Sequence, residues 1–309
     1  METPLTPLEF ARRTRHLHGA REAVVDGDLR LTYEQFFDRC DRWSAALQAL
    51  GVRQGDRVAT IAPNTHAQLE SFYAVPQLGA VLVPMNYRLT ADDFVYMVNH
   101  SGSTVLCVHS DYLDLIDGVR DQMPGVRDFV AFEGARDGWL DYEALISASA
   151  PSFTRPEIDE LDLLTINYTS GTTARPKGVM ITHRNAALNT IGTLLHLPIG
   201  VGERYLWTLP MFHANGWTYT WTVTAAAGGA PAVITRTPGR TSPRCSGGQL
   251  ARLMSTVGAA QSIVVPSSRM SAKARGPSTR RRQRCVPPTA VTIQTKVQPF
   301  AWNIGSVQR

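Results

Sequence analysis

Residues 169–178 have the sequence TSGTTARPKG, which combines hydroxyl groups, glycines and a lysine in one short run. Backbone N–H groups and hydroxyls donate hydrogen bonds to phosphate oxygens, glycine allows close approach, and lysine supplies positive charge. Gly171 and Gly178 are the permissive positions, and Lys177 carries the charge. An apolar strand is expected before the run and a helix capped by Thr182 after it. The run is therefore either a phosphate-binding turn or a solvent-exposed loop rich in serine, threonine and glycine.

A P-loop is the obvious competitor, because its pattern is Gly-x4-Gly-Lys-Ser/Thr. Gly171 and Lys177 have the required separation. Pro176, however, occupies the position of the second glycine, and Gly178 stands where the magnesium-binding hydroxyl is needed. We therefore exclude a P-loop NTPase.

The longer stretch YTSGTTARPKGVMITHRN resembles the phosphate-binding motif of the adenylate-forming enzymes, which include acyl-CoA synthetases, luciferases and peptide-synthetase adenylation domains. Three more stretches follow the order and spacing of that family: LTYEQ (31–35), LGAVLVPMNYRL (78–89) and LPMFHANGW (209–217). The resemblance extends over about residues 5–230. Within the loop, Ala174 departs from the glycine that the family usually has there.

The resemblance implies an AMP-forming acid–thiol ligase. A carboxylate attacks the α-phosphate of ATP to give an acyl-adenylate, and coenzyme A then displaces AMP. Mg²⁺ would bridge the phosphates, with no metal ligand assigned to a side chain. The residues that the resemblance assigns to the β- and γ-phosphates are Thr169, Ser170, Gly171, Thr172, Thr173 and Lys177.

The stretch MFHANGW is assigned by the same resemblance to the acyl substrate. His213 matches the position beside the reacting carboxylate and is the candidate catalytic residue, while Asn215, Gly216 and Trp217 would line the pocket with it. Gly216 leaves room for an acyl chain, which favours a medium- or long-chain fatty acid over an amino acid. Without the family, a histidine among apolar residues is more often structural. Trp217 and Trp221 could equally form one buried helix face.

The elements expected to position these residues alternate in type, which predicts an α/β fold with parallel-rich sheets and crossover helices. It would be an incomplete large N-terminal domain of the adenylate-forming fold. A hairpin is expected in 21–33, around Asp26-Gly27. The other expected strands are 56–62, 80–86, 104–110, 128–133 and 162–170, and the expected helices are 33–50, 65–79 (shortened by Pro76) and 183–197.

Helix 33–50 has the clearest signals. Thr32 and Gln35 form a capping-box pattern, and Gly51 is a C-terminal stop. Its apolar face would consist of Phe36, Phe37, Cys40, Trp43, Ala46, Leu47 and Leu50.

Charge divides the 309 residues into two parts. The net charge is +5, yet all 26 acidic residues lie at or before Glu203. Residues 1–234 carry 18 of the 31 Lys and Arg, a net −8, whereas 235–309 carry the other 13 and no acid. We therefore expect a partial AMP-binding domain at 1–234 and a basic, irregular tail at 235–309. QSIVVP (261–266) could be a strand, but without a neighbour of its kind.

Three interpretations of the tail stay open. It could be a frameshifted reading of a GC-rich gene, which its composition favours. It could be a tail for nucleic acid, although its aromatic residues are only Phe300 and Trp302, so stacking platforms are scarce. It could also belong to a pseudoenzyme that binds nucleotide without turnover.

The tail offers no acid to replace the ribose and magnesium ligands that the family carries further on, so we expect no turnover from the 309 residues. We also expect poor folding, with open sheet edges and uncovered apolar faces. No apolar run is long enough to span a membrane. The four cysteines are far apart in the sequence: Cys40, Cys107, Cys245 and Cys285. This spacing argues against a zinc site or a disulfide framework, and it is typical of a protein in the reducing cytoplasm. The oligomeric state is open.

Overall fold

The computed structural model describes residues 3–169, 175–196, 201, 204–207, 209–213, 218–227, 232–234 and 263–265. All of them belong to one compact unit, Met1–Ser271. The predictions about the basic tail fall almost entirely outside the described residues. The boundary at 234/235 stays a prediction.

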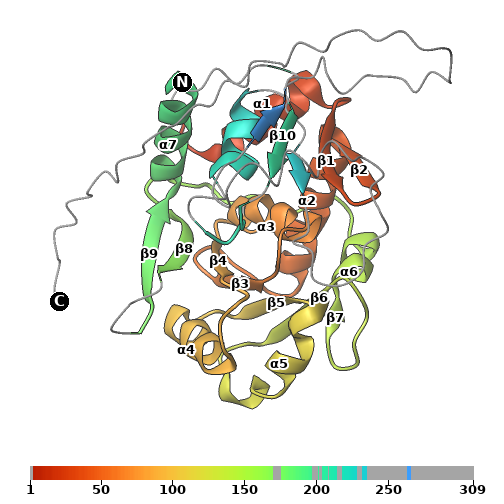
Figure 1. Cartoon of the computed structure of the whole chain (residues 1–309), viewed down its shortest axis with the longest axis vertical. Coiled ribbons are helices and arrows are strands. Elements are labelled where there is room, and N and C mark those ends of the chain that lie inside the picture. The colour runs from red at the N-terminus through yellow and green to blue at the C-terminus, as the bar shows by residue number, and fades with distance from the viewer. Residues whose placement is uncertain are drawn as a thin grey trace, which may run out of the picture. The chain divides into compact units, whose positions relative to one another are not determined.

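A seven-stranded sheet forms the centre of the fold, in the order β7-β6-β5-β3-β4-β8-β9 (Figure 1). Neighbouring strands pair in parallel except β8 and β9, which are antiparallel. The strands are β3 (Arg57–Ile61), β4 (Val81–Met85), β5 (Val105–His109), β6 (Asp128–Phe132), β7 (Leu140–Asp141), β8 (Leu163–Thr169) and β9 (Lys177–Thr182). The expected parallel-rich α/β sheet is confirmed.

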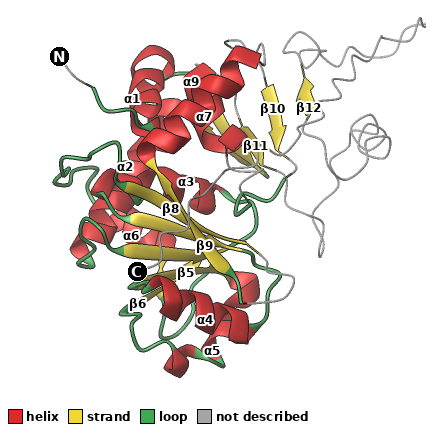
Figure 2. Cartoon of the chain, turned by 90° about the vertical axis from the view of Figure 1, so that its left-hand side faces the viewer, coloured by secondary structure: helices red, strands yellow, loops and turns green. Residues whose placement is uncertain are grey.

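Helices cover both faces of this sheet (Figure 2). One face carries α2 (Tyr33–Ala49), α3 (His66–Ala74) and α6 (Tyr142–Ala148), and the other carries α4 (Ala91–Ser101) and α5 (Leu113–Asp117). Short 3₁₀ turns lie at Pro76–Leu78, Ser110–Tyr112 and Arg120–Gln122. Because successive strand residues point to opposite faces, Val58 packs beneath α2 and α3 while Ala59 packs toward α4. Burial on both faces explains why the parallel strands are continuous apolar runs.

Helix α2 forms as its sequence predicts. Thr32 accepts a hydrogen bond from the Gln35 N–H, and the Gln35 side chain accepts one from the Thr32 N–H, which completes the capping box. Gly51 adopts a left-handed φ of 86° just beyond the helix. Six of the seven predicted apolar positions are buried, namely Phe36, Phe37, Cys40, Trp43, Ala46 and Leu47.

A smaller sheet has the order β12-β10-β11-β1-β2. Its strands are β1 (Glu22–Asp26), β2 (Leu29–Thr32), β10 (Arg204–Trp207), β11 (Ala232–Ile234) and β12 (Ile263–Val265). The β1–β2 hairpin confirms the turn at Asp26-Gly27. The expectation that QSIVVP has no partner is wrong, because β12 pairs antiparallel with β10.

Four further helices contact one another: α1 (Pro7–His18), α7 (His183–His196), η4 (Thr218–Val223) and α9 (Thr224–Ala227). None of the helices in the described part of the chain is both long and apolar enough to cross a membrane.

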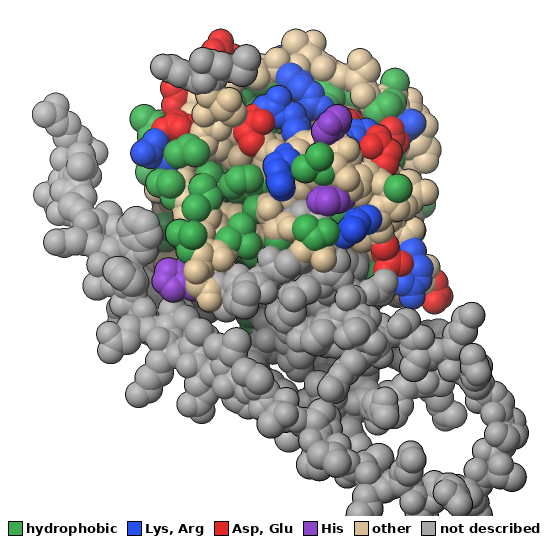
Figure 3. Space-filling view, turned by 90° about the horizontal axis from the view of Figure 1, so that it is seen from above, with side chains coloured by type: hydrophobic (Ala, Val, Ile, Leu, Met, Phe, Trp, Pro, Cys, Tyr) green, Lys and Arg blue, Asp and Glu red, His purple; other side chains and the backbone are tan. Residues whose placement is uncertain are grey.

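An apolar surface remains exposed on β9 and α7. Within the described ranges, β9 is the last strand of its sheet. Met180 on β9 is 65% exposed and Leu195 on α7 is 80% exposed, with Leu188 and Ile191 nearby on the helix. Apolar side chains gather along one side of the molecule in the view from above, where α7 lies (Figure 3). Uncovered apolar surface is therefore present as expected, whereas poor folding stays a prediction.

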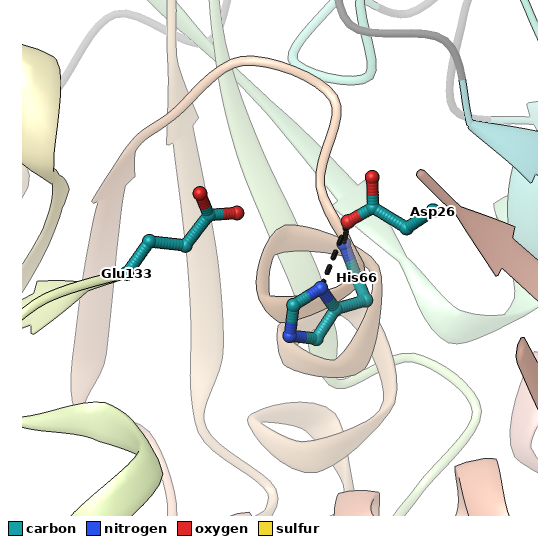
Figure 4. A group of neighbouring side chains, drawn as sticks. All are labelled: Asp26, His66 and Glu133. Carbon is teal, nitrogen blue, oxygen red and sulfur yellow. Dashed lines mark hydrogen bonds and ion pairs between the residues drawn. The ribbon is translucent and has the colours of Figure 1, made fainter. Parts of the chain in front are cut away.

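Buried charges join the two sheets. Asp26 ends β1 and accepts hydrogen bonds from the His66 N–H and from Nδ1 of the His66 ring, the latter at 2.8 Å (Figure 4). His66 Nε2 lies 3.3 Å from Glu143, which is also paired with Arg39. Arg39 in turn pairs at 2.7 Å with Glu70, whose side chain is fully buried.

This group of charged residues could also hold a metal ion. One possible ligand atom from each of Asp26, His66 and Glu133 lies within 4.8 Å of the other two. A metal needs a deprotonated imidazole. Although burial opposes its charge, hydrogen bonds to Asp26 and Glu143 raise the pKa of His66 to about 9, so the ring is cationic at neutral pH. Both ring nitrogens already face carboxylates, and the cluster is therefore an ion-pair network.

The pKa shifts of three groups predict that the free energy of unfolding is greatest near pH 6.5. As the pH rises from the ordinary histidine pKa of 6.5 to about 9, unfolded His66 is deprotonated while the folded form is not, so its stabilisation is lost. Burial lowers the pKa of His183 to about 4, so protonation of the unfolded state removes stability between pH 6.5 and 4. The hydrogen bond from His66 lowers the pKa of Glu143 to about 2, which adds to the loss below pH 4.5. Calorimetry from pH 4 to 9 measures this, and His66→Gln should abolish the alkaline loss; an unchanged alkaline profile would contradict the assignment.

Self-association through the apolar surface of β9 and α7 is also expected. Met180→Lys combined with Leu195→Glu should lower the apparent mass measured by light scattering at high concentration, because both side chains leave water on association. Leu115→Lys, on α5 and 40% exposed, is the matched control and should change nothing. An equal apparent mass for the double variant and for Leu115→Lys would show that the protein does not associate through this surface.

Candidate active site

The described residues of the 169–178 motif belong to the paired strands β8 and β9 or directly precede β9. β8 carries Thr169 at its last position and β9 begins at Lys177, and these two residues are directly opposite each other. Both side chains are exposed. Ser170, Gly171, Thr172 and Thr173 lie outside the described residues.

The expected arrangement of strand, turn and helix needs correction. β9 separates the turn from α7, since residues 177–182 pair along β8 before the helix begins at His183. Thr182 does cap α7, accepting a hydrogen bond from the Asn185 N–H at 3.2 Å. The positive end of α7 is therefore at the far end of β9 from Lys177 and does not point toward that residue.

His213 lies on a turn that two asparagines attach to the sheet. Asn64, three residues beyond the end of β3, donates to the Leu209 carbonyl and accepts from the Met211 N–H, both at 2.8 Å. Asn167 on β8 donates to the Phe212 carbonyl at 3.4 Å, and its amide oxygen accepts from Thr165 at 2.5 Å. The His213 N–H closes the turn on the Pro210 carbonyl.

One cleft of about 1050 Å³ connects the two motifs. Thr169 and His213 both line it, with Asn167 between them on the wall formed by β8. Lys177 is not among the lining residues. Asn215, Gly216 and Trp217, the other predicted acyl-pocket residues, lie outside the described residues.

The opposite wall of the cleft is provided by α4 and carries aromatic groups. Tyr96 and His100 line the cleft, as do Tyr168 from β8 and Arg175, which precedes β9. Partial burial raises the pKa of Tyr168 to about 12, so its phenol stays protonated. Asp93 also lines the cleft, but its carboxylate accepts hydrogen bonds from Thr90 in the capping box of α4. The cleft thus offers hydroxyls, the imidazoles of His100 and His213 and the guanidinium of Arg175, which suit an anionic substrate.

Sequence reasoning did not select Asn64, Asn167, Tyr96 or His100. A weak signal existed for Asn167, since an amide side chain between Ile166 and Tyr168 is unusual in the middle of a strand. Asn64 lies just beyond the expected strand 56–62, and no motif marked it. Tyr96 and His100 are four residues apart on a helix that was not predicted, so no pattern marked them.

A second cleft, of about 980 Å³, lies between α1, α2 and the segment 155–160. Its charged groups are paired with one another, because Asp41 accepts from Arg15 at 2.6 Å and from Arg155 at 2.8 Å. Nothing there points to a ligand.

Comparison with known proteins decides the family. Residues 10–268 match the family described as AMP-binding enzyme. The chain belongs to this family. The match confirms the resemblance drawn from the motifs and continues past residue 234 into the segment expected to be unrelated.

Relatives in this family are CoA ligases. A peroxisomal butyrate–CoA ligase of Arabidopsis thaliana is 36% identical over 241 residues, covering 73% of this chain and 42% of the ligase. A peroxisomal benzoate–CoA ligase of the same plant is 38% identical over 247 residues, with the same coverage. The chain thus spans less than half the length of these relatives.

Solved structures agree on the fold. The N-terminal domain of FACL13 from Mycobacterium tuberculosis, crystallised with an inhibitor, has a TM-score of 0.70 at 29% identity, covering 75% of this chain and 58% of that domain. An anthranilate CoA ligase in complex with anthranoyl-AMP has a TM-score of 0.71 at 24% identity, covering 77% of this chain and 47% of the ligase. The fold is that of the N-terminal domain of adenylate-forming CoA ligases, as predicted.

Asn64→Ala should destabilise the protein and release the turn that carries His213. The substitution leaves the Leu209 carbonyl and the Met211 N–H without their side-chain partner, at a cost of about 1–3 kcal/mol. Urea unfolding measures the loss. Asn99→Ala, which removes one hydrogen bond from an exposed asparagine to the Gln122 carbonyl, is the control and should cost much less. Equal costs would contradict the role given to Asn64.

Proposed function

We propose that the chain carries the phosphate- and carboxylate-binding half of an AMP-forming acyl-CoA ligase, which activates a carboxylic acid with ATP and transfers the acyl group to coenzyme A. The observation that carries this proposal is the shared cleft, where Thr169 of the phosphate motif and His213 of the acyl motif line one space. A nucleophilic carboxylate and the phosphate that it attacks must meet in one place.

Residues 169–177 would hold the triphosphate. Thr169, Ser170, Thr172 and Thr173 would donate hydroxyl hydrogen bonds, Gly171 would allow close approach, and Lys177 would stabilise the negative charge that separates as pyrophosphate leaves. The pairing of Thr169 with Lys177 supports this, because it keeps the two ends of the motif opposite each other.

His213 would lie beside the carboxylate, with Asn215, Gly216 and Trp217 continuing the acyl pocket. The hydrogen bonds of Asn64 and Asn167 support this role, because they fix the backbone on both sides of Met211 and Phe212 and so limit where the imidazole can be. A fixed donor that faces the developing charge needs no reorganisation during the reaction.

Mg²⁺ fits this site as a partner of the nucleotide. The carboxylate of Asp93, within the described cleft, is occupied by the cap of α4, whereas Thr169 offers a hydroxyl. Magnesium usually keeps several waters and binds substrate phosphates. Thr169 and Lys177 would therefore contact the phosphates that carry the ion.

A medium- or long-chain fatty acid is the substrate that we propose. The apolar walls of the described cleft support it, since Phe212, Val179 and Ile181 line it. The relatives named for butyrate and benzoate make short and aromatic acids the competitors to test. A cytoplasmic location stays a prediction, given that both relatives are described as peroxisomal.

Binding of MgATP tests the phosphate site. Lys177→Ala should weaken the affinity measured by titration calorimetry about tenfold, because a charge-assisted contact to phosphate is lost. Arg30→Ala, in the exposed β1–β2 hairpin, is the charge-matched control and should bind like the parent protein. Equal affinity of both variants would refute the assignment of Lys177.

The acyl site has a separate test. His213→Ala should weaken binding of a non-hydrolysable octanoyl-adenylate about tenfold while leaving MgATP affinity within about twofold, because the imidazole faces the carboxylate alone. A benzoyl-adenylate in the same assay separates aliphatic from aromatic preference. Acid-dependent exchange of pyrophosphate into ATP distinguishes a working ligase from a protein that only binds nucleotide. Equal loss of both ligands in His213→Ala would contradict the division of roles.

A further inference from the structure

The two strand ends that flank residues 170–174 both contact the same helix, α4. β8 contributes Tyr168 and the chain returns at Arg175 and Pro176 before β9 begins. Tyr96 and His100 are four residues apart on α4, so they lie one turn apart on one helix face, and their rings are 5.2 Å from each other.

On the returning side, Tyr96 makes two contacts. The Arg175 guanidinium lies 5.0 Å from the centre of the Tyr96 ring, a cation–π distance. The Tyr96 hydroxyl donates a hydrogen bond to the Pro176 carbonyl at 3.3 Å. Lys177 follows immediately, so its backbone position depends on these contacts.

On the entering side, the partner is His100. Nδ1 of His100 lies 2.7 Å from the Tyr168 hydroxyl, and the two rings meet edge to face at 5.8 Å. The ring tautomer decides which of these two groups donates, and the Tyr168 hydroxyl also donates to the Met97 carbonyl of α4 at 3.4 Å. Thr169 follows Tyr168, and its hydroxyl also donates to the Lys177 carbonyl at 3.4 Å.

Helix α4 is a firm base for both contacts. Its N-terminus has a complete capping box between Thr90 and Asp93, and Gly102 ends it in a left-handed conformation. Phe94, Met97 and Val98 are buried beneath it. Tyr96 is partly buried at the edge of that core, and His100 is exposed. Core packing therefore accounts for part of the Tyr96 ring but not for its hydroxyl contact or for His100.

We propose that Tyr96 and His100 are positioning residues for the phosphate site. They hold Tyr168 and Arg175 against α4, which fixes Thr169 and Lys177 opposite each other at the paired ends of β8 and β9. We call the contacts of Tyr96 and His100 with Tyr168, Arg175 and Pro176 the clamp. Its role in phosphate binding rests on the proposed function, whereas the contacts themselves belong to the fold. A preorganised anion site binds more tightly, because the free energy of binding is not reduced by the entropy lost in ordering the chain.

Limited proteolysis tests the clamp without any ligand. Trypsin cleaves after Lys177 but not between Arg175 and Pro176, so the peptide ending at Lys177 reports local opening when followed by mass spectrometry. Tyr96→Leu and His100→Ala should each raise the rate of this cleavage about fivefold to tenfold. Tyr96→Phe keeps the ring and loses the hydroxyl, so it should fall between the parent protein and Tyr96→Leu.

Asn99→Ala is the matched control on the same helix. Its hydrogen bond goes to the Gln122 carbonyl, and the cleavage rate should stay within about twofold of the parent. Melting temperatures of all variants separate local opening from global unfolding. Cleavage at the parent rate in both Tyr96→Leu and His100→Ala would overturn the clamp, as would a rise in Asn99→Ala of equal size.

MgATP affinity then separates the clamp from the proposed function. If the parent binds MgATP, Tyr96→Leu and His100→Ala should weaken its affinity about fivefold, with no change for Arg30→Ala, which lies outside the cleft. If cleavage rises while affinity is unchanged, the positioning role is wrong even though the contacts exist. If the parent binds no MgATP but cleavage rises as expected, the clamp stands and the proposed function fails.

Discussion

Parallel pairing of β3 with β4 and β5 is the constraint on which the site depends. These strands are buried on both faces, so their side chains belong to the two cores and are not available for chemistry. Few polar side chains lie within these strands, so the polar groups of the site come from the ends of β3 and β8 and from Asn167 within β8. Asn64 lies three residues beyond the end of β3, and Thr169 ends β8, which pairs with β4. The fold therefore gathers its reactive groups at one edge, where ligands of open α/β sheets usually bind.

Two sets of hydrogen bonds position the residues at that edge of the sheet. Asn64 and Asn167 attach the turn of His213 to the sheet, and α4 attaches the β8–β9 hairpin to the opposite wall. These supports come from segments far apart in the sequence, and each acts through one or two hydrogen bonds of ordinary strength. Adenylate chemistry needs this accuracy because the carboxylate must approach the phosphorus along one line.

Local signals made much of the fold predictable. The capping box at Thr32 and the turn at Asp26-Gly27 depend on residues a few positions apart, so the sequence alone specified α2 and the first hairpin. The family motifs pointed to Thr169 and His213. β9 was missed because Lys177–Thr182 becomes a strand only by pairing with β8, and its apolar alternation is interrupted. Tyr96 and His100 were missed because their roles arise from contacts about 70 to 80 residues along the chain.

Hydrogen exchange of the backbone, with and without a non-hydrolysable octanoyl-adenylate, tests the central claim most directly. One ligand should slow exchange both at 168–178 and at 209–213, since the account puts these segments on one cleft around a single acyl-phosphate bond. Protection of one segment without the other, or protection confined to the cleft beside Arg15 and Asp41, would contradict it.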